Sequence, residues 1–325
     1  MSQAHEDRVA REIANYQDTL DIHALPDIFH YWSNKYLAPA LVEVFGSGDL
    51  TAIFASELAD SAERTSTPAI VSVGAGDGSV EIGLASWMRA NGRGPFHFDL
   101  LELSPFLIER GQAAAAAAGL SDVIHFQRVD LTSWQPTRRY GAAFAHHSLH
   151  HITALEHVFD QIRSSLADGG SFVTSDMIGR NGHMRWPETE RLVSRIWRSM
   201  PDRYRYNHQL RRTEEDFVNW DCSGESFEGI RAQDILPELL KRFHFHRFCG
   251  WGGMTDIFTD RSFGHNLKLG DAHDQEFIDN LAVADRELTL LGAITPTSMI
   301  AVMRKEAGLL VSNGLNPASC VRWPD

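Results

Sequence analysis

Short apolar runs that alternate with helical segments constrain the fold of this 325-residue chain more than any other feature. Each run is bounded by glycine or polar residues, which indicates a buried strand. Strands that alternate with helices predict βαβ units, and therefore a doubly wound α/β sheet, mostly parallel, with helices on both faces. We expect seven strands. They are residues 69–73, 96–101, 124–129, 142–145, 171–175, 243–248 and 297–303.

The same alternation divides the chain into five parts. Residues 1–66 have apolar residues at helical spacing, which predicts either a helix packed on the core or a helical lid over a ligand site. Residues 67–180 hold the regular strand and helix alternation. Residues 181–242 interrupt it and predict a helical cap insertion, and residues 243–305 complete the sheet. Residues 306–325 are expected to form a C-terminal tail.

The charge balance narrows the class of partner. The chain has 43 acidic and 30 basic residues, for a net charge of −13, and such a surface repels phosphate backbones. We therefore expect no nucleic-acid partner. No run of 18 apolar residues occurs, so we expect no membrane span. Three widely spaced cysteines favour a reducing compartment, and we expect a cytoplasmic protein.

Polar residues follow four of the predicted strands. They are the glycine-rich residues 74–78, Glu102, Asp130 and residues 146–151. In an open parallel sheet, ligands bind beyond the carboxyl ends of the strands, where these residues meet. Alternate glycines allow a ligand to approach the backbone, although a dinucleotide fingerprint would place its third glycine at position 79, which is Ser79. Glu102 suits a ribose diol, and Asp130 suits an adenine amino group.

Several of these segments resemble one known family. Residues 71–78 (VSVGAGDG), 100–105 (LLELSP) and 126–131 (FQRVDL) are similar to three successive motifs of the class I S-adenosylmethionine-dependent methyltransferases. Residues 148–152 (SLHHI) and 166–171 (LADGGS) resemble later segments of the small-molecule branch, and the order is the same. The resemblance covers about residues 67–180.

The resemblance implies a Rossmann-like methyltransferase fold with S-adenosylmethionine as cofactor and S-adenosylhomocysteine as product. It implies that Glu102 holds the ribose, and that Asp130 and the next backbone N–H contact adenine. The implied cofactor contacts are Gly74, Ala75, Gly76, Asp77, Gly78, Glu102, Leu103, Asp130, Leu131 and His146.

Four histidines lie within residues 146–151. Their spacing cannot direct all four to one ion, and no acidic or cysteine ligand stands beside them in the sequence, so we expect no metal. Methyl transfer needs alignment of donor and acceptor. A hydroxyl or ammonium acceptor must also lose a proton, which a histidine can accept, whereas a thioether has none to lose. The candidate catalytic residues are His147, His146 and His150.

The acceptor contacts are expected outside the sheet. Aromatic side chains can enclose a cationic group, and the cap and acidic charge favour a small-molecule acceptor. Oxygen or nitrogen is the expected methylated atom, and the sulfur of a thioether amino acid is kept as an alternative acceptor. The candidate acceptor contacts are Tyr31, Trp32, Tyr36, His151 and Trp251.

Two other functions remain compatible with these residues. One is a non-catalytic structural or regulatory subunit that binds S-adenosylmethionine, and the other is an NAD-dependent dehydrogenase on a similar sheet. The apolar stripe near residues 277–291 could pack on the sheet or on a second subunit, so a homodimer is a possible assembly.

Overall fold

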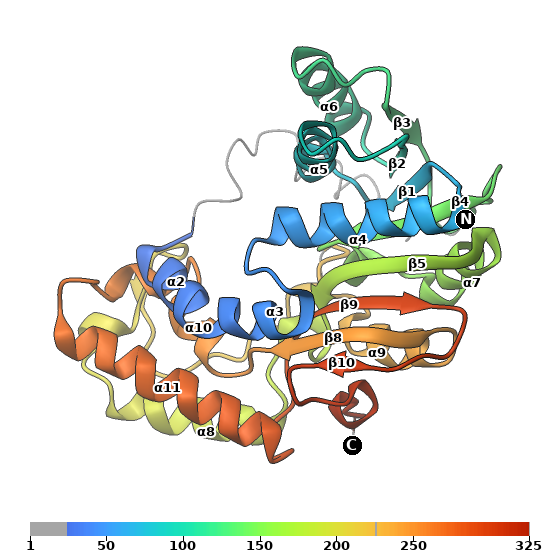
Figure 1. The fold of residues 1–325 in the computed structure, drawn as a ribbon. Coiled ribbons are helices and arrows are strands. Elements are labelled where there is room, and N and C mark those ends of the chain that lie inside the picture. The colour runs from blue at the N-terminus through green and yellow to red at the C-terminus, as the bar shows by residue number, and fades with distance from the viewer. Residues whose placement is uncertain (1–24, 225, 325) are drawn as a thin grey trace.

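The computed structural model describes residues 25–224 and 226–324, which build one large mixed sheet (Figure 1). The strand order is β10-β8-β9-β5-β4-β1-β2-β3, and β9 runs antiparallel to both of its neighbours while the other pairs are parallel. A separate two-stranded hairpin joins β6 (Tyr206–Asn207) to β7 (Arg212–Thr213). The strands of the large sheet are β1 (Ala69–Val73), β2 (His97–Glu102), β3 (Ile124–Arg128), β4 (Tyr140–His146), β5 (Leu166–Met177), β8 (His244–Trp251), β9 (Ser298–Arg304) and β10 (Val311–Ser312).

All seven predicted strands are present, but the sheet has an eighth strand that the sequence does not reveal. The expected C-terminal tail contributes β10, which pairs with the edge of β8. The side chain of Asn313 donates a hydrogen bond to the backbone oxygen of Gly250 at 2.8 Å. Leu315 and Cys320 are buried in the core. The tail expectation is therefore wrong here, because the unpaired backbone of an edge strand offers hydrogen bonds to a segment as short as two residues.

Helices cover both faces of the sheet, and each face has its own apolar core. One face is packed by α7 (Leu155–Ser165) and α9 (Ala232–Leu240). The helices of the other face are α3 (Ala38–Phe45), α4 (Leu50–Thr65), α5 (Ser79–Ala90) and α6 (Pro105–Ala117). This is the predicted doubly wound arrangement.

Residues 50–65 pack on the core, which is the first of the two predicted arrangements, and do not form a lid. Leu58 of α4 is buried, and the Ser61 hydroxyl donates to the backbone oxygen of Gly141 in β4 at 2.7 Å. Residues 27–65 have the length and apolar composition of a membrane-spanning helix, but here α4 lays its apolar side on the sheet, and the stretch bends at Gly46, where φ is +79°. Residues 1–24 of the same predicted segment lie outside the described part.

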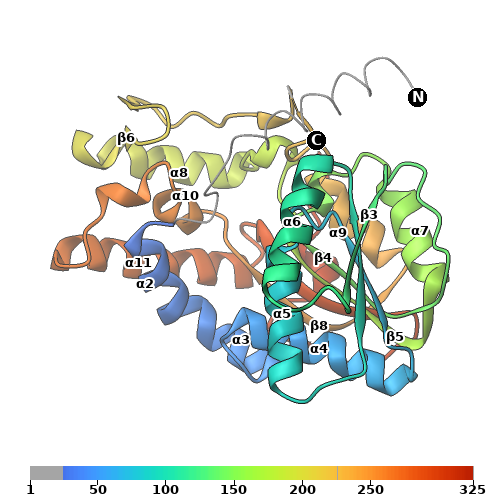
Figure 2. The same cartoon turned by 90° about the horizontal axis from the view of Figure 1, so that it is seen from above.

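A third apolar core lies in a helical cap beyond the carboxyl ends of the parallel strands (Figures 1 and 2). The cap is built from distant segments. They are α2 (Asp27–Trp32), α8 (Pro187–Ser199), α10 (Thr255–Thr259) and α11 (Ala272–Leu290). The cap predicted over residues 181–242 is therefore only partly correct, since α9 packs on α7 and covers the sheet. The stripe of α11 packs inside the cap, where Ile278 is fully buried.

Candidate active site at the switch point of the sheet

The strand order reverses between β1 and β4, which are neighbours although they are not successive in the chain. A crevice for ligands forms at such a point. The segments that follow the two strands meet there, since the Ser148 hydroxyl donates to the backbone oxygen of Val73 at 2.7 Å. A Cβ atom on Gly74 would lie 2.7 Å from the Cβ of Ser148. The glycine loop and the histidine segment therefore form one site.

The glycine loop has the conformation that the sequence predicts. Gly74, Gly76 and Gly78 all have φ between +59° and +69°, where other residues are strained. Gly78 is closely packed, because a Cβ there would come within 2.7 Å of Phe126. At Gly76 a Cβ would meet nothing within 4 Å. The loop therefore leaves its backbone open at Gly76, as a cofactor that lies against it requires.

Glu102, at the end of β2, joins the second predicted motif to this loop. One of its carboxylate oxygens accepts a hydrogen bond from the backbone N–H of Gly76 at 2.9 Å. The other accepts from Leu103 and Ser104 at 2.8 and 2.7 Å. The carboxylate is thus fixed beside the open part of the loop, and its oxygens can accept hydrogen bonds from the ribose hydroxyls of S-adenosylmethionine. The ribose contact itself stays a prediction.

The other predicted cofactor residues lie around the same edge. One carboxylate oxygen of Asp130 accepts from the backbone N–H and the hydroxyl of Thr132, at 2.9 and 2.6 Å. Leu131 packs against the core of the face that holds α7. Asp77 accepts from the backbone N–H of Ser79 at 3.1 Å and lies 3.4 Å from Arg110. The adenine contacts predicted for Asp130 and Leu131 stay predictions.

The three candidate catalytic histidines have different surroundings. His146 packs its ring parallel to that of Phe144, with the centroids 6.2 Å apart. His147 has an exposed side chain, and its φ of +48° is uncommon outside glycine. Its backbone N–H donates to Ser175 at 2.8 Å. The residue as a whole is exposed, but protein atoms bury part of its imidazole, and this burial lowers the pKa of His147. His150 is buried.

His150 is surrounded by carboxylates that the sequence analysis did not connect with it. Its Nδ1 lies 2.6 Å from Asp176 in β5, and its Nε2 lies 3.3 Å from Glu228. His183 and His151 contact the same Glu228, at 2.5 and 3.4 Å. Burial alone would lower the pKa of His150, but the two carboxylates outweigh it and raise the pKa to about 10. Burial opposes ionisation of Asp176 and Glu228, yet the histidines hold both pKa values below the usual range.

The candidate acceptor residues separate into two groups. Trp32, Tyr36 and Trp251 come from distant segments and line one cavity of about 110 Å³ beside β8 and the cap. Tyr31 shares Asp279 with Tyr36, since their hydroxyls donate to the same carboxylate at 3.0 and 2.8 Å. His151 does not line this cavity and instead contacts Glu228, the carboxylate that His150 and His183 also contact.

Residues 49–232, more than half of the chain, match the family described as the methyltransferase domain. The chain belongs to this family. It is an S-adenosylmethionine-dependent methyltransferase, and the glycine loop, Glu102 and the histidine segment lie within the matched range. The family match supports the methyltransferase interpretation over the dehydrogenase alternative. Among curated proteins, no sequence matches the chain.

Solved structures that are similar to this chain include a C-methyltransferase, a cyclase and an O-methyltransferase. A geranyl diphosphate C-methyltransferase from Streptomyces coelicolor A3(2) is 13% identical, with a TM-score of 0.46 over 94% of this chain and 99% of that chain. The [4+2]-cyclase SpnF is 16% identical, with a TM-score of 0.45 over 92% of each chain. An O-methyltransferase from a trans-AT PKS multienzyme of Brevibacillus brevis is 12% identical, with a TM-score of 0.43 over 84% of this chain and 83% of that chain.

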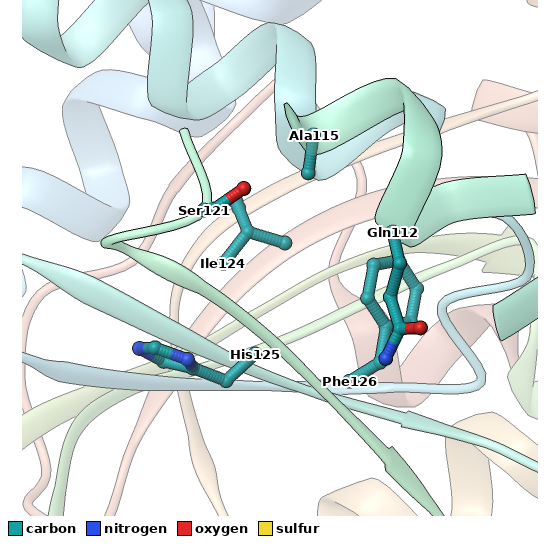
Figure 3. A pocket seen from close by; sticks show the side chains of 6 residues that line it. All are labelled: Gln112, Ala115, Ser121, Ile124, His125 and Phe126. Atoms are coloured by element: carbon teal, nitrogen blue, oxygen red, sulfur yellow. The ribbon is translucent and has the colours of Figure 1, made fainter. Parts of the chain in front are cut away.

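A larger hollow of about 290 Å³ in this methyltransferase lies away from the switch point, between α6 and the edge strand β3 (Figure 3). Ile124 and Phe126 share one face of the strand, and His125 projects from the other because side chains alternate along a strand. The lining includes Gln112, Ala115 and Ser121 and has no acidic or basic side chain besides His125. This hollow has none of the carboxylates and glycines that make up the candidate active site.

Proposed function

We propose that this methyltransferase transfers the methyl group to an oxygen or nitrogen of a small-molecule acceptor, and that His147 accepts the proton that the acceptor loses. The observation that carries the proposal is the position of the helical cap. It brings Trp32 and Tyr36 over the carboxyl end of β8, where they form a cavity with Trp251. A cavity between the cap and the sheet suits a small acceptor, and the net charge of −13 disfavours a nucleic acid.

Among the three candidate histidines, geometry favours His147 as the proton acceptor. His150 is held between two carboxylates, and His146 packs its ring against Phe144 and Phe54. His147 is an exposed residue, and its left-handed backbone conformation is typical of residues that are held in place for a function. When bound, S-adenosylmethionine supplies an electrophilic methyl group and leaves as S-adenosylhomocysteine. His147 takes the proton from the hydroxyl or ammonium that forms the new bond.

The acceptor class is tested with methyl-labelled S-adenosylmethionine and a cell extract of the source organism, separated by size into metabolites and macromolecules. The proposal expects label in the metabolite fraction. Label confined to nucleic acid or protein would contradict it. Cofactor binding without transfer into either fraction would support the non-catalytic alternative.

The role of His147 is tested with the variants His147→Ala and His147→Gln, and with the labelled metabolite fraction as acceptor. General-base catalysis contributes about 100-fold or more, so turnover should fall by that factor while cofactor affinity changes little. Added imidazole should restore part of the activity of His147→Ala. The exposed His244, at the opposite end of β8 from the cap, provides a control in His244→Ala. Normal turnover of both His147 variants would contradict the assignment and favour a thioether acceptor.

A further inference from the structure

Three side chains from separate elements converge beside the candidate active site. His150 lies in the 3-10 turn Leu149–His151 after β4, His183 lies in the turn Asn181–His183 after β5, and Glu228 lies in the loop before α9. Their ligand atoms all lie within 4.8 Å of one another. The Nε2 of His183 is 2.5 Å from a Glu228 oxygen, and the Nε2 of His150 is 3.3 Å from the same oxygen.

Asp176 orients the first of these ligands. Its carboxylate contacts the Nδ1 of His150 at 2.6 Å, and it also accepts the backbone N–H groups of Ser148 and Leu149 at 3.0 and 2.7 Å. With its Nδ1 bonded to a fixed carboxylate, the imidazole presents Nε2 to the other two residues. Histidines that bind metals are typically held in this way by an outer carboxylate.

The backbone fixes the other two ligands relative to each other. The N–H of Gly182 donates to the backbone oxygen of Gly229 at 2.9 Å, which joins the turn of His183 to the loop of Glu228. Gly182 and His183 both have positive φ, +66° and +57°. Left-handed conformations outside glycine are costly and cluster at functional sites. The convergence of His183 and Glu228 is therefore built into the backbone.

We propose that His150, His183 and Glu228 bind one divalent transition-metal ion of the Zn²⁺ type. Two imidazole nitrogens and one carboxylate oxygen are a typical donor set for such ions, whereas Mg²⁺ and Ca²⁺ prefer oxygen alone. Three protein ligands also leave a coordination position for an outside oxygen or nitrogen. Use of that position by the acceptor rests on the proposed function, but binding of the ion does not.

The test uses tag-free, chelator-treated full-length protein, titrated with Zn²⁺ in competition with a chromogenic chelator and, separately, with Co²⁺ by visible absorption. We expect one ion per chain and a visible spectrum of bound Co²⁺ that is typical of a low coordination number. The single variants His183→Ala and Glu228→Gln should each weaken Zn²⁺ binding by about tenfold or more. Loss of an outer carboxylate typically costs about 10- to 100-fold, which is the effect expected for Asp176→Asn.

Two controls separate this site from the other histidines among the 16 in the chain. His244→Ala removes an exposed histidine at the far end of β8 and should leave Zn²⁺ affinity unchanged. Mg²⁺ should not compete. Absence of Zn²⁺ binding in the wild type, or binding that persists unchanged in both ligand variants, would overturn the proposal and leave an ion-pair network. Because no acceptor is needed, the result is independent of the proposed methyl transfer.

Discussion

Glu81 is a buried acid one turn beyond the glycine loop, in the first turn of α5. One of its carboxyl oxygens accepts a hydrogen bond from the Ser72 hydroxyl at 2.5 Å. Burial raises the pKa of Glu81 to about 7, since the charged form has lost its water. The folded protein therefore holds a proton there that the unfolded chain releases near its ordinary pKa.

This raised pKa predicts a pH dependence of stability. The stabilisation from Glu81 is fully present below the unfolded pKa of about 4.3 and is lost as pH rises through about 7. At about 1.4 kcal/mol per pKa unit, the change between pH 4 and pH 8 amounts to roughly 3 kcal/mol. Glu81→Gln should remove it. Urea unfolding of both proteins from pH 4 to pH 8 measures the difference, and parallel curves would contradict the assignment.

The sequence predicts which polar residues lie at the ligand-binding edge of the sheet where one rule applies, namely that they follow parallel strands. That rule gives Glu102, Asp130 and the glycine loop. It also applies to Asp176, which directly follows the predicted strand 171–175, although no role is predicted for it. His183 and Glu228 lie in irregular turns, where the sequence has no hydrophobic periodicity from which their positions could be predicted. They lie close to His150 only because segments far apart in the chain contact one another.

At the scale of elements, the glycine loop shows how backbone conformation produces a site. Gly76 and Gly46 provide a matched pair, because both have positive φ and a Cβ on either would meet nothing within 4 Å. Gly46 ends α3, and Gly76 lies at the open part of the glycine loop. The two glycines differ in the function of the element and not in local strain.

Gly76→Ala and Gly46→Ala should therefore destabilise the protein by a similar amount, about 1 kcal/mol, because alanine is strained at positive φ. Only Gly76→Ala should also weaken binding of S-adenosylhomocysteine, since its new methyl group occupies the space against the loop. Thermal unfolding and calorimetric titration measure the two effects. Equal cofactor affinity in both variants would place the cofactor elsewhere.

At the scale of the molecule, the cap is a second packing unit built on the sheet. Its core contains Trp197, which is fully buried and lies near the rings of Phe217, Phe258 and Phe263. The sequence predicts the sheet better than the cap, because the hydrophobic patterns of its strands and helices and their alternation can be seen locally in the sequence. The cap joins α2 to segments more than 150 residues away, and only its apolar stripes are visible in the sequence.

Trp197→Ala should cost about 3–5 kcal/mol, the range for removal of a buried aromatic side chain. If the cap is a separate unit, hydrogen exchange should rise first in α2, α8, α10 and α11 and little in β4 and β5. Phe159→Ala is the matched variant in the core of the sheet, where Phe159 is also fully buried. It should raise exchange in the sheet and α7. A uniform response to both variants would contradict a separate cap.

The central claim is that the switch point binds S-adenosylmethionine through the glycine loop and Glu102. Calorimetric titration of the full chain with S-adenosylmethionine, S-adenosylhomocysteine and NAD tests it most directly. We predict one site per chain for the first two ligands, no binding of NAD, and binding to Glu102→Ala weakened by roughly 1.5–3 kcal/mol, the scale of a charge-assisted hydrogen bond. No binding of either adenosyl compound, binding of NAD, or unchanged affinity in a folded Glu102→Ala protein would contradict the claim.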